Sequence, residues 1–339
     1  TKAWYIACLS SELGSKPLAR MILGMPLVLF RSDNGEAAAL LDRCAHRNVP
    51  LSPGRVEQGQ LECPYHGWRF DGEGRCKRVP ALCTAPGFKR GVVPSYAARE
   101  SDGYVWVYME AGVEPPTDPF RLPLQREAGY STVRRMVEAE ATLHATVENA
   151  LDVPHTAFLH RGLFRGTGEA NRIKAIVTRE HDRVQTEYVG EPRPEGLAGR
   201  ILSPSGGMVS HFDRFILPSV AQVEYALGED THILVTAVCT PVEDFRTRMY
   251  ANVSFRASWI PAWLVKMVLY PIALKIFAQD AVILKQQSES IKRFAGESYT
   301  STDVDLMGPQ VWRLLRRAER GKLAEDDDPN WRREIELEV

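Results

Sequence analysis

The sequence predicts an α+β protein of two domains, a small all-β domain followed by a larger domain with an antiparallel sheet and a long C-terminal helix. Its 339 residues suit two domains better than one. Short strand-like runs and turns fill the first part, while longer alternating runs and one long helical run fill the rest. The proline-rich acidic segment 112–120 is typical of a linker. We therefore expect domains at residues 1–115 and 116–339.

The composition excludes several classes of protein. Apolar residues make up 44% and charged residues 25%, the shares of an ordinary globular protein. The net charge of -1 provides no broad basic field, so we expect no nucleic acid partner. Six cysteines are too few for a disulfide scaffold, with a Cys76–Cys83 disulfide as the alternative to free thiols. Residues 1–14 lack the pattern of a signal peptide, so we expect a cytoplasmic location.

Turn signals divide the first domain into strands. Two apolar runs in MPLVLFRSDNGEAAALLDR, residues 25–43, flank a turn at Asp33-Asn34-Gly35. Two further turn signals lie in FDGEGRC, residues 70–76. YVWVYME, residues 104–110, is β-branched and aromatic and predicts a strand.

The second domain begins with strand-like character in residues 137–160, which then becomes helical. Residues 259–296 predict a long helical region, bent or interrupted at Pro261 and Pro271. The charged tail, residues 319–339, predicts a solvated end. Four segments between them predict strands of an antiparallel sheet: 173–190, 208–227, 232–242 and 248–259.

The stretch CAHRNVPLSPGRVEQGQLECPYHGW, residues 44–68, contains C-x-H and C-x2-H pairs. Thiolates with imidazoles suit zinc or an iron–sulfur cluster. Zinc motifs usually keep one ligand type in each pair, whereas here each pair is mixed. Both cysteines can thus hold one iron and both histidines the other, which is the ligation of a Rieske [2Fe–2S] centre. A zinc site is the alternative for these four residues: Cys44, His46, Cys63 and His66.

This stretch resembles the Rieske domain of the Rieske non-haem iron oxygenases, including Trp68 and the arginines Arg43 and Arg47. The resemblance implies an N-terminal all-β Rieske domain and a helix-grip (START-like) catalytic domain, in which an antiparallel sheet wraps around a long C-terminal helix. It also implies that His46 and His66 face outward and pass electrons to a partner.

A second constellation lies in ENALDVPHTAFLH, residues 148–160. Two histidines and a carboxylate form the facial triad of non-haem Fe(II) oxygenases. The pattern N-x2-D-x2-H-x4-H resembles the mononuclear iron motif of the same family. The resemblance implies that His155 and His160 are iron ligands and that Asp152 links this site electrically to a Rieske histidine. Asn149 is expected to order a water or a ligand, with an ordinary surface asparagine as the alternative.

The spacing of the motif sets a local requirement. Asp152 and His155 are three residues apart and share one face of a helix. His155 and His160 are about 140° apart on an ideal helix, so the helix must distort or end between them. The resemblance implies a third, carboxylate ligand on a late helix, for which we choose Asp280, with Glu289 as the alternative. Asp280 follows an apolar run, and iron would remove the cost of burying its charge.

The resemblance also implies a reaction and its partners. A ferredoxin and/or flavin reductase, drawing on NAD(P)H, reduces the cluster. The subunits form a head-to-tail homotrimer, in which an electron passes from His46 or His66 of one subunit through Asp152 to the iron of the next. Fe(II) binds O2, and oxygen is inserted into a C–H bond, with mono- or dioxygenation left open. His144, His181, His211 and His232 are assigned no role.

The substrate is predicted from residues 258–280, which are unusually apolar but interrupted by prolines. They predict either a core helix or an interfacial segment beside a pocket mouth, with peripheral membrane contact. Glycine-rich segments at 162–169 and 201–208 are expected to form entrance loops.

We therefore expect a bulky apolar substrate, with methyl oxidation or demethylation of a sterol or triterpenoid as the main hypothesis. O- or N-demethylation of an aromatic compound is the alternative. A non-catalytic lipid-binding or electron-transfer protein is the alternative from another class, and iron content separates it from an oxygenase.

Overall fold

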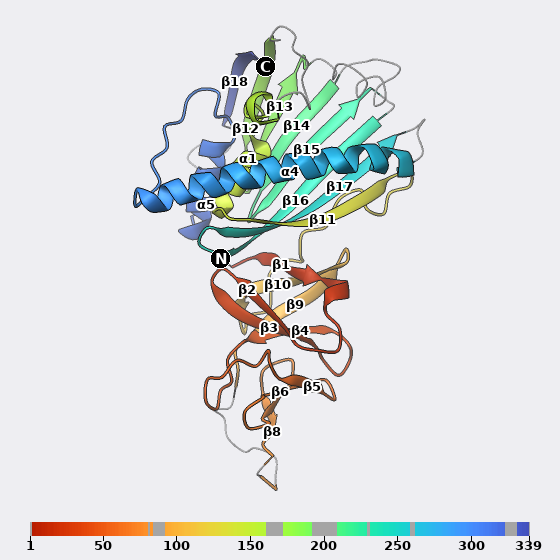
Figure 1. Ribbon diagram of the computed structural model, residues 1–339, viewed down its shortest axis with the longest axis vertical. Coiled ribbons are helices and arrows are strands. Elements are labelled where there is room, and N and C mark those ends of the chain that lie inside the picture. The colour runs from red at the N-terminus through yellow and green to blue at the C-terminus, as the bar shows by residue number, and fades with distance from the viewer. Residues whose placement is uncertain are drawn as a thin grey trace. The chain divides into compact units, whose positions relative to one another are not determined.

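The structure is a computed structural model that describes residues 2–80, 82–83, 92–160, 172–191, 209–228, 231–257, 262–322 and 331–338. It divides into two compact units, Thr1–Leu122 with Thr240–Glu243 and Pro123–Cys239 with Asp244–Val339 (Figure 1). Within the described ranges, no helix is long and apolar enough to cross a membrane. The two glycine-rich segments expected at the entrance lie outside these ranges.

The described residues of the first unit form strands and one 3-10 turn at Ser10–Glu12, in agreement with the predicted all-β domain. Its six-stranded antiparallel sheet has the order β1-β10-β9-β4-β3-β2. Those strands are β1 (Trp4–Leu9), β2 (Leu18–Ile22), β3 (Met25–Arg31), β4 (Ala37–Leu41), β9 (Ser95–Ser101) and β10 (Tyr104–Ala111). A second sheet is formed in sequence order by β5 (Arg55–Glu57), β6 (Gln60–Glu62), β7 (Arg69–Phe70) and β8 (Cys76–Arg78). Cys76 and Cys83 are free thiols.

The sequence of strand β3 explains why the six-stranded sheet forms in this part of the chain. Its apolar run places Leu27 and Leu29 in one core, and Val28 and Phe30 in another. Successive side chains of a strand point to opposite faces, so an unbroken apolar run is buried on both faces. The core beneath Phe30 also contains two of the predicted cluster ligands, Cys44 and Cys63.

The second unit contains an eight-stranded antiparallel sheet of order β11-β17-β16-β15-β14-β13-β12-β18. Its strands are β11 (Ser131–Ala139), β12 (Arg172–Arg179), β13 (Arg183–Val189), β14 (Val209–Ile216), β15 (Val220–Leu227), β16 (Thr231–Glu243), β17 (Arg246–Ala257) and β18 (Arg332–Glu338). The helices are α1 (Leu143–Leu151), α2 (Thr156–Leu159), α4 (Ala262–Arg293) and α5 (Gly308–Glu319). Helix α4 crosses one face of the sheet (Figure 1), and the predicted α+β fold is confirmed.

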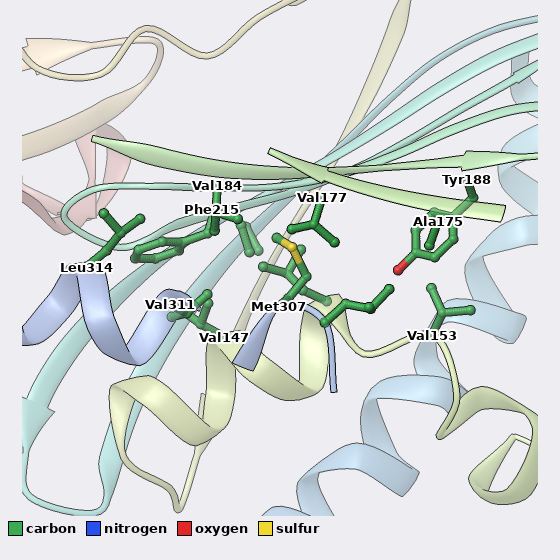
Figure 2. Close-up of a cluster of buried hydrophobic side chains, with 14 of the residues drawn as sticks. Val147, Val153, Ala175, Val177, Val184, Tyr188, Phe215, Met307, Val311 and Leu314 are labelled. Atoms are coloured by element: carbon green, nitrogen blue, oxygen red, sulfur yellow. The ribbon is translucent and has the colours of Figure 1, made fainter. Parts of the chain in front are cut away.

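The core of this unit lies between the sheet and helices α1 and α5. Figure 2 shows Val184 and Phe215 from neighbouring strands facing Val147 of α1 and Leu314 of α5. Phe215 is fully buried, and burying a side chain of this size stabilises the fold by roughly 1.5–3 kcal/mol. The packing of α1 on the sheet positions the chain that follows it, which contains Asp152, His155 and His160.

The C-terminal segment corrects one expectation, because residues predicted to be a solvated end form strand β18 instead. This strand pairs antiparallel with β12 along its whole length. Its sequence RREIELE alternates, so Leu337 is buried while charged residues face outward. Ion pairs from Lys174 to Glu334 and from Arg172 to Glu338 join it to β12. Because most residues of the tail are charged, the alternation typical of a strand is not apparent from its sequence.

Helix α4 corrects a second expectation. It continues through Pro271, so the interruption predicted there is wrong, and Pro261 lies outside the described residues. A proline inside a helix removes one backbone hydrogen bond, and this helix also packs on β11 and β17. Among the described side chains in the apolar first half of α4, four are exposed: Trp263, Met267, Tyr270 and Leu274.

Candidate metal centres

The first candidate centre is formed by two loops with the same backbone hydrogen bonds. The carbonyl of Cys44 accepts from the amide four residues later, and its amide donates to the carbonyl five residues later. The backbone of Cys63 does the same. The four N···O distances are 3.0 Å for Asn48 to Cys44, 2.8 Å for Cys44 to Val49, 3.1 Å for Gly67 to Cys63 and 2.8 Å for Cys63 to Trp68. Two matched loops thus present one thiol each.

Both loops turn at the same position through a left-handed residue. Asn48 has φ 61° and Gly67 has φ 68°. These are residue types that adopt this conformation at low cost. A Cβ at Gly67 would also approach the Pro80 side chain to 3.0 Å. A glycine at position 67 therefore avoids both backbone strain in the turn and a tight contact with Pro80.

The four predicted ligands converge from these loops. Cys44 and Cys63 are buried in the core below, while the rings of His46 and His66 lie 4.6 Å apart. The ring of His46 stacks on Trp68 at 4.5 Å with an interplanar angle of 3°. Thiols and imidazoles thus lie in two separate pairs, the arrangement that a [2Fe–2S] cluster with two-cysteine and two-histidine irons requires.

The chemistry of these groups fits such a cluster. Burial and the neighbouring Cys63 raise the pKa of the Cys44 thiol to about 11, so a thiolate here needs a cation beside it. Desolvation, together with His66 and Arg47, lowers the pKa of His46 and favours the neutral imidazole that ligates metals. Its Nδ1 is buried, and no described group forms a hydrogen bond with it. An iron ligated there would satisfy that atom.

The second candidate centre begins where helix α1 ends. Asp152 caps the helix in an extended conformation, and the single helical turn α2 separates His155 from His160. The expected end of a helix between the two histidines is therefore the end of α2 at Leu159, while α1 ends before both. Asp152 and His155, however, do not share a helix face, because α1 ends at Leu151. Their side chains meet through the intervening turn, with His155 Nδ1 at 3.4 Å from Asp152 Oδ2.

Three side chains from distant parts of the sequence converge at this centre. His155 Nε2 lies 3.2 Å from His160 Nε2. Asp280 Oδ1 lies 3.1 Å from His160 Nε2 and 3.7 Å from His155 Nε2. Adjacent ligands of an octahedral ion with bonds of about 2.1 Å lie about 3.0 Å apart, so these three atoms can form one face of a coordination sphere. The alternative residue, Glu289, is exposed and outside this group.

Two neighbouring side chains orient these ligands. Asn149 Nδ2 donates to Asp280 Oδ1 at 3.4 Å. Gln279 Oε1 lies 3.0 Å from His160 Nδ1, so Nδ1 carries the proton and Nε2 is left for a metal. Sequence reasoning did not identify Gln279. Its position beside Asp280 was the available signal, but only the fold brings His160 within its reach.

The electrostatics favour a bound cation. Burial raises the pKa of Asp280, although His160 and His155 oppose this effect. Burial also disfavours the charged form of His155, but Asp152 and Asp280 outweigh it and the pKa of His155 is raised. A divalent ion would compensate the buried carboxylate directly. Two imidazoles and one carboxylate are also the donor set of mononuclear non-haem iron, so these residues fit such an ion.

A cavity of about 830 Å³ adjoins the centre. Asn149, Asp152 and His155 line it on one side. Its volume is within the range of small-molecule sites, which are largely apolar with a few polar groups. Further lining comes from both kinds of residue: Leu151, Val153, Leu159, Tyr188, Leu284, Glu148, Gln287 and Asp305.

Comparisons with known proteins agree with this geometry. Residues 3–97 match the Rieske [2Fe-2S] domain, and residues 139–321 match the vanillate O-demethylase oxygenase C-terminal domain. Chlorophyllide a oxygenase of Chlamydomonas reinhardtii is 35% identical over 96% of this chain and 50% of its own length. The oxygenase component of dicamba O-demethylase from Stenotrophomonas maltophilia is 38% identical over 47% of each chain.

Among solved structures, dicamba monooxygenase bound to dicamba has a TM-score of 0.76 and 26% identity, with 95% of this chain and 98% of that chain covered. The chain spans about half the length of the curated relatives described above. The match to the vanillate O-demethylase oxygenase C-terminal domain alone covers more than half of the chain and includes the second centre. The chain therefore belongs to the Rieske non-haem iron oxygenases, with a catalytic domain of the vanillate O-demethylase oxygenase type.

Proposed function

We propose that this chain is the oxygenase component of a demethylase that acts on O-methyl or N-methyl aromatic compounds. The convergence of His155, His160 and Asp280 beside a cavity carries this proposal. Hydroxylation of the methyl group would consume O2, two electrons and two protons and yield water. The hydroxymethyl product would then lose formaldehyde and leave a phenol or an amine.

Each group of side chains has a separate role in the proposal. Cys44, Cys63, His46 and His66 hold a [2Fe–2S] cluster that receives electrons from NAD(P)H through a ferredoxin and/or a flavin reductase. His155, His160 and Asp280 hold Fe(II), whose open positions would accept O2 when the metal is bound. Asn149 and Gln279 keep the ligand atoms aimed at one point.

Asp152 is the proposed electron entry. Its carboxylate contacts His155 and lines the cavity, and its side chain is 34% exposed. A residue of a second copy can therefore reach it. In a head-to-tail homotrimer, His46 or His66 of a neighbouring subunit would supply the electron at this carboxylate. The basic residues beside the cluster loops, Arg43 and Arg47, have the opposite charge to the acidic lining that Glu148 and Asp305 add to the cavity.

Two observations support an aromatic demethylation. The cavity has room for a ring system, and apolar side chains such as Leu151 and Leu284 form part of its lining. The dicamba O-demethylase relative and the structural match to dicamba monooxygenase both carry the name of such a substrate.

Methyl oxidation of a polycyclic substrate, such as a sterol or triterpenoid, is the second candidate. A relative aligned over 96% of this chain is an oxygenase named for chlorophyllide. The exposed apolar side chains of α4, from Trp263 to Leu274, would suit the approach of a large lipophilic molecule.

A panel of substrates tests the choice between aromatic demethylation and oxidation of a polycyclic substrate. Iron-loaded protein with a reductase system and NADH would be given methoxy-arenes, methylamino-arenes, sterols and triterpenoids. We expect formaldehyde and a demethylated product from at least one arene, in equal amounts. Products from polycyclic substrates alone would replace the first candidate with the second. Full iron content without O2-dependent product from any class would contradict both candidates.

A further inference from the structure

A line of hydrogen-bonded ionisable side chains runs through the second unit beside the metal centre. Glu191 Oε2 lies 2.6 Å from His211 Nδ1, and His211 Nε2 lies 3.1 Å from Asp213 Oδ1. Asp213 also accepts a hydrogen bond from the Tyr188 hydroxyl. The strand register brings these groups together, because Tyr188 pairs with His211 across β13 and β14, and Asp213 lies two residues further along the same face.

These groups are almost completely removed from water. His211 and Asp213 are each 1% exposed and Tyr188 is 2% exposed. Aromatic rings stack on both sides of His211, Tyr188 at 4.5 Å and Tyr225 at 4.0 Å. This stacking keeps the imidazole from contacting a ligand. Burying an imidazole between two carboxylates is expensive compared with burying apolar residues, and neither metal centre uses these groups.

The two ends of the line differ in their surroundings. Glu191, at the outer end, has an 18% exposed side chain. Tyr188, at the inner end, lines the cavity that Asp152 and His155 also line. Val153, drawn below the Tyr188 ring in Figure 2, belongs to the same cavity wall. The line therefore connects a partly solvated carboxylate to the cavity beside the metal centre.

We propose that Glu191, His211, Asp213 and Tyr188 form a chain that stores one proton and delivers it to the cavity during O2 reduction. The reaction creates this demand, since RH, O2, two electrons and two protons give ROH and H2O. This inference rests on the proposed oxygenase activity, but it does not depend on which substrate is oxidised. A substrate bound in the cavity would displace water from beside the metal centre, and buried acids can then provide a proton.

Each transfer along the chain leaves the groups balanced. His211 starts as an imidazolium held between Glu191 and Asp213, and its Nε2 proton passes to Asp213. Protonated Asp213 then donates to the Tyr188 oxygen, and the Tyr188 hydroxyl releases its own proton into the cavity. One proton is delivered and His211 is left neutral with its proton on Nδ1, and a proton from water in the cavity restores the imidazolium along the same path between turnovers. The ionisable groups that face His211 are Glu191 and Tyr188 from the β13 side, Asp213 on β14 and Tyr225 on β15.

The Tyr188→Phe variant tests the chain, because it keeps the stacked ring and removes the final donor. Tyr225→Phe is the matched control, since it removes the hydroxyl of the other tyrosine stacked on His211, which is not among the residues that line the cavity. In single turnover we expect product formation by Tyr188→Phe to fall about 10- to 100-fold, with both metals retained. The slowed reaction should speed up with added buffer acid and show a larger solvent isotope effect, whereas Tyr225→Phe should match the wild type.

Either of two results would overturn the proposal. One is a Tyr188→Phe variant that forms product at the wild-type rate. The other is a slowed variant whose rate ignores buffer acid and D2O, because that behaviour indicates a structural role. A wild-type protein that makes no product from any substrate would instead count against the proposed function.

A second measurement, the protonation of His211, tests the same proposal without enzymatic turnover. In ¹⁵N-histidine spectra of protein lacking the mononuclear iron, His211 should show two protected N–H signals at neutral pH. These signals should persist until the imidazole titrates near a pKa of about 9, since Asp213 and Glu191 outweigh the effect of its burial. Asp213→Asn should lower that pKa. A His211 that titrates near its ordinary value with rapidly exchanging N–H groups would show that the chain is not assembled.

Discussion

Gln279 Oε1 lies 3.0 Å from His160 Nδ1, on the side of the imidazole opposite Asp280. A single turn of helix α4 thus fixes the tautomer of one proposed ligand and provides another. Hydrogen bonds of this kind to the far nitrogen of a metal-bound histidine commonly change metal affinity by 10- to 100-fold. The contact between Gln279 and His160 therefore leads directly to a prediction about metal affinity.

Gln279→Leu is expected to weaken Fe(II) binding at the second centre by roughly 10- to 100-fold, because His160 loses the acceptor that holds its proton on Nδ1. Metal titration of iron-stripped protein measures the effect. Gln287→Leu, on the same helix and lining the cavity, is the control and should leave iron affinity unchanged. Equal affinities for wild type and Gln279→Leu would remove the orienting role.

Asp280→Ala is expected to lose the mononuclear iron and keep the cluster. Iron content should fall from about three to about two per chain, because the cluster has two irons and the second centre one. The visible spectrum of the cluster should be unchanged. Glu289→Ala is the control. It alters an exposed carboxylate on the same helix and should retain all the iron. Full iron content in Asp280→Ala would show that the ligand is another residue.

Asp152→Asn is expected to retain both metals and to lose turnover. The amide keeps the size of the side chain but removes the charge beside His155 Nδ1. Iron content and cluster reduction by dithionite should match the wild type, while product formation falls by at least about 100-fold. Wild-type turnover by this variant would remove the proposed electron entry.

The pH dependence of stability tests the His211 cluster. The pKa of His211 is raised to about 9 from an ordinary value of 6.5, so its folded-state charge is stabilised. That contribution is fully present below about pH 6.5 and is lost as pH rises through about 9, with an upper limit of about 3 kcal/mol. The free energy of unfolding of the wild type should therefore fall across this window more steeply than that of His211→Gln. Parallel curves would contradict the charged histidine.

Strand β18 supplies a test of the fold. Leu337→Ala should lower the free energy of unfolding by about 2–4 kcal/mol, because it leaves a cavity in the core under β12. Glu336→Ala, on the exposed face of the same strand, should change it by less than about 0.5 kcal/mol. Chemical denaturation measures both values. A neutral Leu337→Ala would mean that the tail is solvated after all.

Local patterns were sufficient for much of the fold. Alternating apolar residues predict the antiparallel strands, and the mixed C-x-H and C-x2-H pairs point to the cluster loops. The His155–His160 spacing also predicts that no helix continues through both histidines, and the helical turn α2 does end at Leu159, whereas the end of α1 at Leu151 was not predicted. Asp280 was chosen by family resemblance and burial, and its role as a ligand stays a prediction although the structure brings it to both histidines.

The remaining features depend on contacts that no local pattern contains. The tail forms β18 because β12 offers an open edge, which the charge of the tail does not reveal. Helix α4 passes through Pro271 because the sheet packs against it elsewhere. His211 was given no role from sequence, since only the register of three strands places it between Tyr188 and Tyr225.

The most direct test of the central claim is a single turnover followed at both centres. Iron-loaded protein, reduced without O2 and supplied with a methoxy- or methylamino-arene, would be mixed with O2 while the cluster spectrum and the products are recorded. We predict that the cluster is oxidised as formaldehyde and the demethylated arene form, and that Asp280→Ala shows neither event. A cluster that stays reduced, or product that forms without the mononuclear iron, would contradict the account.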